Sequence, residues 1–97
     1  MNAIMDLFSL NGKNAVVTGA NTGLGQGICV ALAAAGAHVF GVARRSCDET
    51  AAKIAAEGGQ FTEIRADLSD FSAIDSILEQ IHAHADRIDI LVNNAGI

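Results

Sequence analysis

A glycine-rich segment between a short apolar run and a helical pattern constrains the fold of this chain more than any other feature. Glycines stand at positions 19, 23, 25 and 27, directly after the apolar run Lys13–Thr18. Glycine in a helix destabilises the helix by roughly 1 kcal/mol relative to alanine, so the presence of several glycines here indicates a specific structural role. A helix that follows a buried strand presents free N–H groups and the positive end of its dipole. We therefore interpret the segment as a strand–loop–helix unit whose backbone approaches a phosphate closely.

The rest of the chain alternates short apolar runs with helical patterns. The pattern predicts strands over residues 13–18, 38–43, 60–65 and 87–94, with helices over about 24–35, 46–57 and 70–85. This alternation is typical of an α/β fold, a doubly wound parallel sheet of the Rossmann type with strand order 3-2-1-4. Because the pattern stops after the fourth strand, we expect residues 1–97 to form the N-terminal portion of a single such domain, truncated before its second half.

The predicted helices have recognisable apolar faces and ends. Ser46 and Glu49 have the spacing of a capping box, and Gly36 suits the position that ends the first helix. The apolar faces are expected to contain Leu24, Ile28, Leu32 and Ala35 in the first helix, and Phe71, Ile74, Ile77, Leu78 and Ile81 in the last.

Composition excludes several classes of protein. Apolar residues make up 51% of the chain, which argues against disorder, and the net charge of −5 argues against a nucleic-acid binder. Residues 1–10 lack the basic and apolar regions of a signal peptide, and no segment suits a membrane span. We therefore expect a cytoplasmic protein.

The cysteines and histidines carry no pattern of a metal or catalytic site. Cys29 and Cys47 are predicted to be reduced thiols, Cys29 packed and Cys47 somewhat acidified in a helical first turn. His38, His82 and His84 are interpreted as surface or packing residues.

Two sequence motifs at characteristic positions indicate the class of protein. Residues 18–25 read TGANTGLG, a TGxxxGxG pattern distinct from GxGxxG, and no Gly-Lys-Ser/Thr follows as in a P-loop. Residues 93–96 read NNAG after the apolar "DILV". Together with Asp67-Leu68, these motifs resemble the short-chain dehydrogenase/reductase family over the whole chain. A methyltransferase also has a glycine loop after its first strand, but NNAG disfavours that alternative.

The resemblance implies a dinucleotide site. In the family, the glycine loop holds the pyrophosphate and ribose of NAD or NADP. An Asp after the third strand accepts a hydrogen bond from the adenine amino group, and NNAG lies over the adenosine. Asp67 could also be a solvent-exposed acidic residue of a loop or a helix cap. Asn93 is expected to connect neighbouring strands through hydrogen bonds of its side chain. The cofactor-binding residues implied are Gly19, Asn21, Thr22, Gly23, Leu24, Gly25, Asp67, Leu68, Asn94, Ala95 and Gly96.

The residues after the second strand bear on the identity of the cofactor. NAD-binding domains place an acidic residue roughly twenty residues beyond the glycine loop, where it binds the ribose 2′-hydroxyl. Ala43 occupies that position, and Arg44 and Arg45 follow. A guanidinium binds a 2′-phosphate through charge-assisted hydrogen bonds, so Arg44 favours NADP. NAD stays open, because Thr22 stands where many NADP users of the family have a basic residue, and a surface role for both arginines stays open too.

In the family, the catalytic Ser and the Tyr-x-x-x-Lys pair come after the NNAG motif, where this sequence ends. The chain contains no tyrosine. We therefore assign no catalytic residue and expect the chain alone to be inactive. The segments "LFSL", "TGLGQG" and "GAHVFGV" resemble family members that interconvert hydroxyl and keto groups on deoxy sugar acids, although gluconate 5-dehydrogenases share much of this stretch. The resemblance also implies a homo-oligomer, a tetramer in the family. The remaining alternative is a nucleotide-binding module without chemistry.

Overall fold

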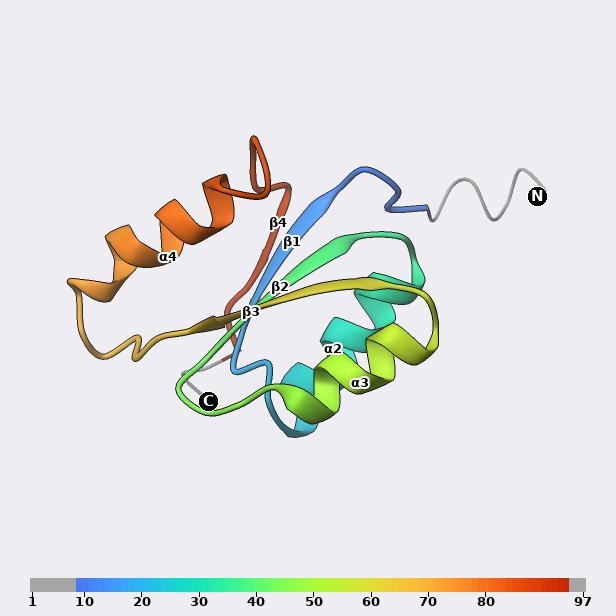
Figure 1. The fold of residues 1–97 in the computed structure, drawn as a ribbon, viewed down its shortest axis with the longest axis horizontal. Helices are drawn as coiled ribbons and strands as arrows, with labels where there is room; N and C mark the ends of the chain where they lie inside the picture. Colours follow the sequence, from blue (N-terminus) through green and yellow to red (C-terminus); the bar gives the residue numbers. More distant parts are fainter. Residues whose placement is uncertain (1–8, 95–97) are drawn as a thin grey trace.

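The chain folds around a four-stranded parallel sheet (Figure 1). The computed structural model describes residues 9–94. The strands lie in the order β3-β2-β1-β4, which confirms the predicted 3-2-1-4 arrangement. The elements in chain order are β1 (Asn14–Thr18), α2 (Gly23–Ala34), β2 (His38–Ala43), α3 (Asp48–Ala56), β3 (Gln60–Arg65), α4 (Ala73–His82) and β4 (Ile90–Val92).

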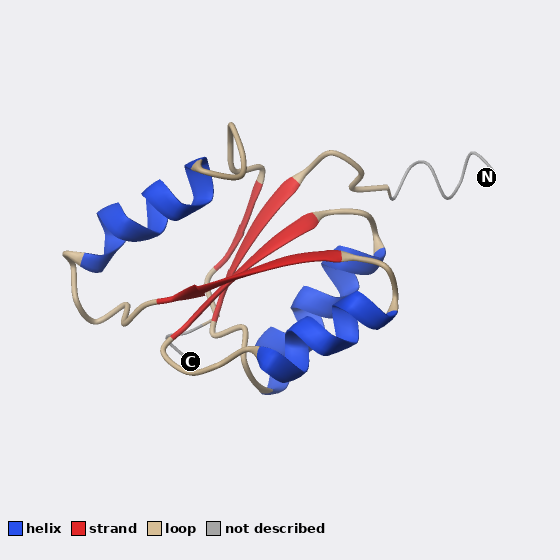
Figure 2. Ribbon diagram, viewed as in Figure 1, coloured by secondary structure: helices blue, strands red, loops and turns tan. Residues whose placement is uncertain are grey.

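The two faces of the sheet are covered differently (Figure 2). Helices α2 and α3 lie together on one face, and α4 lies on the other. Alternate residues of each strand follow this division, as the two-residue period of a strand requires. In β1, Ala15 and Val17 belong to the core under α2 and α3, whereas Val16 packs with Ile77 and Ile81 under α4.

Strand β4 is shorter than the predicted 87–94 strand, because hydrogen bonds to side chains take the place of part of the backbone ladder with β1 at both of its ends. Before β4, the carboxylate of Asp89 accepts the N–H of Asn14 at 2.8 Å and pairs with Arg87 Nε at 2.8 Å. After β4, the N–H of Asn94 donates to the hydroxyl of Thr18 at 2.8 Å. The regular ladder with β1 is therefore confined to residues 90–92.

Helix α2 packs on the sheet through small residues. Its buried positions are Gly25, Cys29 and Ala33. The prediction that Leu24 starts the apolar face is wrong, since Leu24 is 67% exposed. The predicted end of the helix is confirmed. Gly36 has a φ of +109°, its N–H donates to Ala33 O at 3.0 Å, and an alanine there would overlap the Asn11 side chain.

Helix α3 starts without the predicted capping box. Its N-cap is Cys47, and Ser46 Oγ accepts the N–H of Asp48 at 3.1 Å rather than that of Glu49. The N–H of Cys47 donates to the carboxylate of Glu63 on β3. The Glu63 side chain of β3 therefore accepts a backbone N–H that would otherwise lack a partner at the start of α3.

The α4 face carries an apolar groove. Helix α4 begins later than predicted, because the Asp70 carboxylate accepts both the N–H and the hydroxyl of Ser72, at 2.9 and 2.7 Å. Phe71 consequently lies outside the helix and is 85% exposed, which contradicts its predicted place on the apolar face. Between α4 and the sheet lies a groove of about 650 Å³, whose lining includes Ile74, Leu78, Ile88 and Leu91.

Candidate functional site

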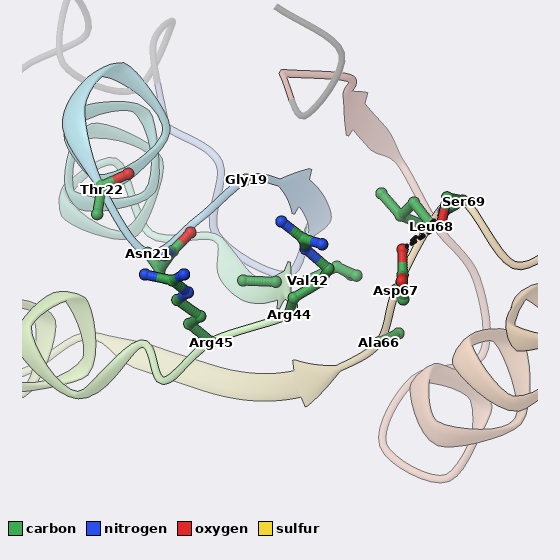
Figure 3. A pocket seen from close by; sticks show the side chains of 11 residues that line it. Gly19, Asn21, Thr22, Val42, Arg44, Arg45, Ala66, Asp67, Leu68 and Ser69 are labelled. Atoms are coloured by element: carbon green, nitrogen blue, oxygen red, sulfur yellow. Dashed lines mark hydrogen bonds between the residues drawn. The ribbon is translucent and has the colours of Figure 1, made fainter.

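A cleft of about 520 Å³ opens where β1, β2 and β3 end (Figure 3). Ligands of open α/β sheets bind outside the carboxyl ends of the strands, near the point where strand order reverses. This cleft lies outside the carboxyl ends of the strands, because its walls come from the segments after three neighbouring strands. The lining residues are Gly19, Asn21, Thr22, Val42, Ala43, Arg44, Arg45, Ala66, Asp67, Leu68 and Ser69.

The glycine loop forms one wall of the cleft. Gly19 has a φ of +65°, and its N–H donates to Val42 O at 2.8 Å, so the loop turns sharply against β2. Thr22 is the N-cap of α2 but makes no side-chain cap hydrogen bond, and the first turn contains no acidic residue. The first N–H groups of α2 and its dipole are therefore available to an anion in the cleft.

Gly25 has a packing role that the sequence did not reveal. A Cβ at this position would overlap the carbonyl oxygen of Gly19 and lie 2.7 Å from the Asn94 amide nitrogen. The absence of a side chain at Gly25 therefore lets α2 lie directly against the glycine loop.

The NNAG motif also has contacts within the chain. Asn94 Nδ2 donates to Gly19 O at 3.4 Å, and the Thr18 hydroxyl donates to Asn93 Oδ1 at 3.3 Å. The prediction that Asn93 ties neighbouring strands is confirmed. Ala95 and Gly96, also predicted to contact the cofactor, lie outside the described residues.

Two arginines make the opposite wall electropositive. Arg44 and Arg45 follow directly after Ala43, the last residue of β2, and both are exposed. In Figure 3 the guanidinium of Arg45 lies beside Asn21 and that of Arg44 above Val42. None of the ion pairs found within residues 9–94 includes either arginine. Within the described residues, neither guanidinium is therefore at ion-pair distance from a carboxylate.

Asp67 is the one acidic residue among those that line the cleft. Its Oδ1 accepts the hydroxyl of Ser69 at 2.7 Å and the N–H of Ser69 at 2.9 Å. These hydrogen bonds lower the pKa of Asp67, and the charge of Arg44 lowers it further. Asp67 is thus an ionised acceptor held by a local turn at the edge of the cleft.

The structure brings together only part of the predicted site. Gly19, Asn21, Thr22, Arg44, Asp67 and Leu68 share the cleft, whereas Gly23, Leu24 and Gly25, the first residues of α2, are not among the residues that line it. Sequence reasoning omitted Val42, Ala43, Arg45, Ala66 and Ser69 from the site. Their common signal is position, since each lies at the last residues of a strand or within a few residues after it.

The two thiols are buried and do not face the cleft. Burial raises the pKa of Cys29 to about 12. Burial, with Glu63 as a neighbouring negative charge, raises the pKa of Cys47 to about 11. The prediction of an acidified Cys47 is therefore wrong, because desolvation and the Glu63 carboxylate outweigh the helix start.

A metal centre and a membrane-spanning helix are two further kinds of functional element to consider within residues 9–94. No group of three histidine, cysteine or acidic side chains in this part of the chain is arranged to hold a metal ion. None of the helices described there has the length and hydrophobicity that crossing a bilayer requires.

A parallel sheet with a glycine loop at its first crossover and a cleft at its carboxyl edge defines a Rossmann-type fold. The family model described as short chain dehydrogenase matches residues 13–97, and the chain belongs to this family.

Proteins with different named activities share this part of the sequence. The chain is 46% identical over 94 residues to 2-dehydro-3-deoxy-D-gluconate 5-dehydrogenase from Dickeya dadantii (strain 3937), covering 97% of this chain and 37% of that protein. It is 46% identical over 90 residues to fatty acyl-CoA reductase from Acinetobacter baylyi (strain ATCC 33305 / BD413 / ADP1), covering 91% of this chain and 30% of that protein.

A solved structure with a bound cofactor matches as well. It is a protein from Agrobacterium tumefaciens assigned as a 2-deoxy-D-gluconate 3-dehydrogenase, with bound NADP. The identity is 53% and the TM-score is 0.78, with 93% of this chain and 35% of that chain covered. The chain thus spans between 30% and 37% of the length of these three relatives.

Proposed function

We propose that this chain is the cofactor-binding part of an NAD(P)-dependent oxidoreductase. The observation that carries the proposal is the cleft at the carboxyl ends of β1–β3, walled by the glycine loop and by two arginines outside any ion pair described here. The pyrophosphate would lie against Gly19–Thr22 and the start of α2. The adenosine would lie between Arg44 and Asp67–Leu68. When bound, the nicotinamide supplies hydride transfer to or from a carbon that bears oxygen.

NADP is the proposed preference over NAD. Ala43 ends β2 where a carboxylate would repel a 2′-phosphate, and Arg44 and Arg45 follow it into the cleft. The NADP bound by the Agrobacterium tumefaciens relative supports this choice.

Cofactor titrations test the preference. The protein expressed from the complete reading frame would be titrated with NADPH and NADH, alongside the Arg44→Ala and Arg45→Ala variants. We expect at least one variant to weaken NADPH binding by roughly tenfold or more and to leave NADH binding nearly unchanged. Arg87→Ala is the matched control, because Arg87 is an exposed arginine that does not line the cleft. A protein that prefers NADH, with NADPH binding unchanged in both variants, would contradict the proposal.

The proposed substrate is a deoxy sugar acid, by similarity to the Dickeya dadantii and Agrobacterium tumefaciens proteins. The equal identity to a fatty acyl-CoA reductase means that the substrate must be tested directly. The assay offers 2-dehydro-3-deoxy-D-gluconate with NAD(P)H, 2-deoxy-D-gluconate with NAD(P)⁺, gluconate with NAD(P)⁺, and a fatty acyl-CoA with NAD(P)H. Turnover of the first two substrates is expected. Turnover of the acyl-CoA alone would contradict the proposed substrate and would indicate an acyl-CoA reductase instead.

A second candidate is a dinucleotide-binding module without chemistry, because the cleft described above accounts for binding of the cofactor alone. Reading the gene beyond codon 97 separates the two candidates. A downstream Tyr-x-x-x-Lys supports the oxidoreductase. A stop codon directly after Ile97 supports the binding module.

A further inference from the structure

Thr50 is a completely buried polar side chain on α3, with a relative exposure of 0%. Its hydroxyl donates a hydrogen bond of 2.8 Å to the carbonyl oxygen of Ala20 in the glycine loop. The two residues are 30 positions apart, and Ala20 is itself buried. The contact therefore joins the first turn of α3 to a backbone group of the candidate site.

Thr50 lies in the first turn of α3, and its hydroxyl bonds a remote carbonyl rather than a group of its own helix. Threonine hydroxyls in a helix ordinarily bond a carbonyl of their own helix or face solvent, and threonine is a poor helix former. Valine has almost the same shape and would fill the same apolar surroundings. The hydroxyl matters because a buried carbonyl without a donor carries a full desolvation penalty.

Peptide geometry transmits this contact to the cleft. The described peptide bonds are all trans, so the carbonyl of Ala20 and the N–H of Asn21 point in opposite directions from one plane. Holding the carbonyl toward α3 directs that N–H away from α3. Asn21 lines the cleft. Thr50 therefore fixes the rotation of the peptide that forms part of the cleft wall.

Helix α3 is itself held at two other points. The N–H of its N-cap, Cys47, donates to the Glu63 carboxylate of β3. Further along, Lys53 Nζ donates to Gln26 Oε1 on α2 at 2.8 Å. These contacts join α3 to β3 and to α2, and the helix begins at Asp48, three residues after Arg45.

We propose that Thr50 is a positioning residue that sets the glycine loop for the pyrophosphate of the dinucleotide. This inference rests on the proposed function. Thr50 acts through Ala20 and does not line the cleft. Its loss is expected to weaken phosphate-containing ligands selectively, because the arginines and Asp67 stay in place for the adenosine.

Thr50→Val and Thr50→Ser, made in the protein expressed from the complete reading frame, test this inference. Binding of NADP⁺, ADP and adenosine would be measured for folded variants whose thermal unfolding has been recorded. Thr50→Val is expected to weaken NADP⁺ and ADP binding by roughly tenfold and adenosine binding by less than about twofold. Thr50→Ser retains the hydroxyl and is expected to bind all three ligands nearly as the parent does.

Three outcomes overturn the inference: unchanged ADP binding in Thr50→Val, equal losses of ADP and adenosine binding, or a serine variant as impaired as the valine variant. If Thr50→Val does not fold, Thr50→Ala replaces it, because alanine removes the hydroxyl without adding bulk. If the parent protein itself binds no dinucleotide, the proposed function is wrong. That outcome is distinct from a failure of the Thr50 inference, because it is seen without any variant.

Discussion

The backbone N–H of Asn94 donates a 2.8 Å hydrogen bond to the hydroxyl of Thr18, across 76 positions of the sequence. The same hydroxyl is 3.3 Å from Asn93 Oδ1 and 3.4 Å from Val92 O. The threonine that opens the TGxxxGxG motif and the asparagines that open NNAG thus form one polar junction between β1 and β4.

Replacing Thr18 by valine should destabilise this junction. The change leaves the N–H of Asn94 without its acceptor in a partly buried position, and we expect a loss of about 1–3 kcal/mol in the free energy of unfolding. Thr18→Ser, which keeps the hydroxyl, should lose less. Urea unfolding of the three proteins measures the difference, and equal midpoints for all three would show that the junction adds no stability.

Gly25 and Gly27 offer a matched pair on α2. An alanine at Gly25 would overlap the Gly19 carbonyl, whereas a Cβ at Gly27 has no neighbour within 4 Å. Gly25→Ala should destabilise the protein by about 1–3 kcal/mol through overpacking. Gly27→Ala should stabilise it by up to about 1 kcal/mol, because alanine favours the helix. Thermal unfolding of both variants tests the contrast. Equal effects would refute the close approach of α2 to the loop.

The thiols should resist modification in the folded protein. Both cysteines are buried, and their pKa values are raised to about 12 for Cys29 and about 11 for Cys47. At pH 8, Ellman's reagent should therefore react at least about tenfold more slowly with the native chain than with the chain in guanidinium chloride. Cys29→Ser and Cys47→Ser identify which thiol is measured. Rapid reaction of the native protein would contradict the packing of α2 and α3.

Stability should decrease on mild acidification because of His38. Its ring stacks on Phe40 with centroids 4.2 Å apart, and its Nε2 lies 2.8 Å from Thr62 Oγ1. Burial lowers the pKa of His38, and His84 lowers it further. The unfolded chain therefore binds a proton first as the pH falls through about 6.5, and the stability present above that pH is progressively lost.

Unfolding free energies measured from pH 8 to pH 5 test this expectation. His38→Gln should flatten the dependence, since glutamine keeps a hydrogen-bonding group but does not titrate. The pKa values of Asp67 and Asp89 are also lowered, and these groups act at a lower pH, below about 4. An unchanged slope in His38→Gln would assign the effect to another group.

The sequence predicted the sheet order and three of the four strands closely, because β-branched runs and glycine turns are local signals. It failed where a distant side chain decides the local structure. Glu63 sets the start of α3 at Cys47. The start of α4 was missed for a local reason, because Asp70 accepts the N–H and the hydroxyl of Ser72, two positions along the chain. For the candidate site, motifs identified the glycine loop, Arg44 and Asp67. Thr50 could not be found, because nothing local distinguishes a buried threonine that bonds a remote carbonyl from one that only fills space.

The strand order has a consequence for synthesis of the protein. Strand β1 is made first but lies inside the sheet, and its partner on one side, β4, pairs Ile90 with Ala15. At translation rates of about 5–20 residues per second, β4 follows β1 by roughly 4–15 s. Throughout that interval β1 has one edge without a partner, and that edge can recruit a strand from another nascent chain. Newly made copies of this protein are therefore most vulnerable to mispairing on the ribosome, before β4 has been made.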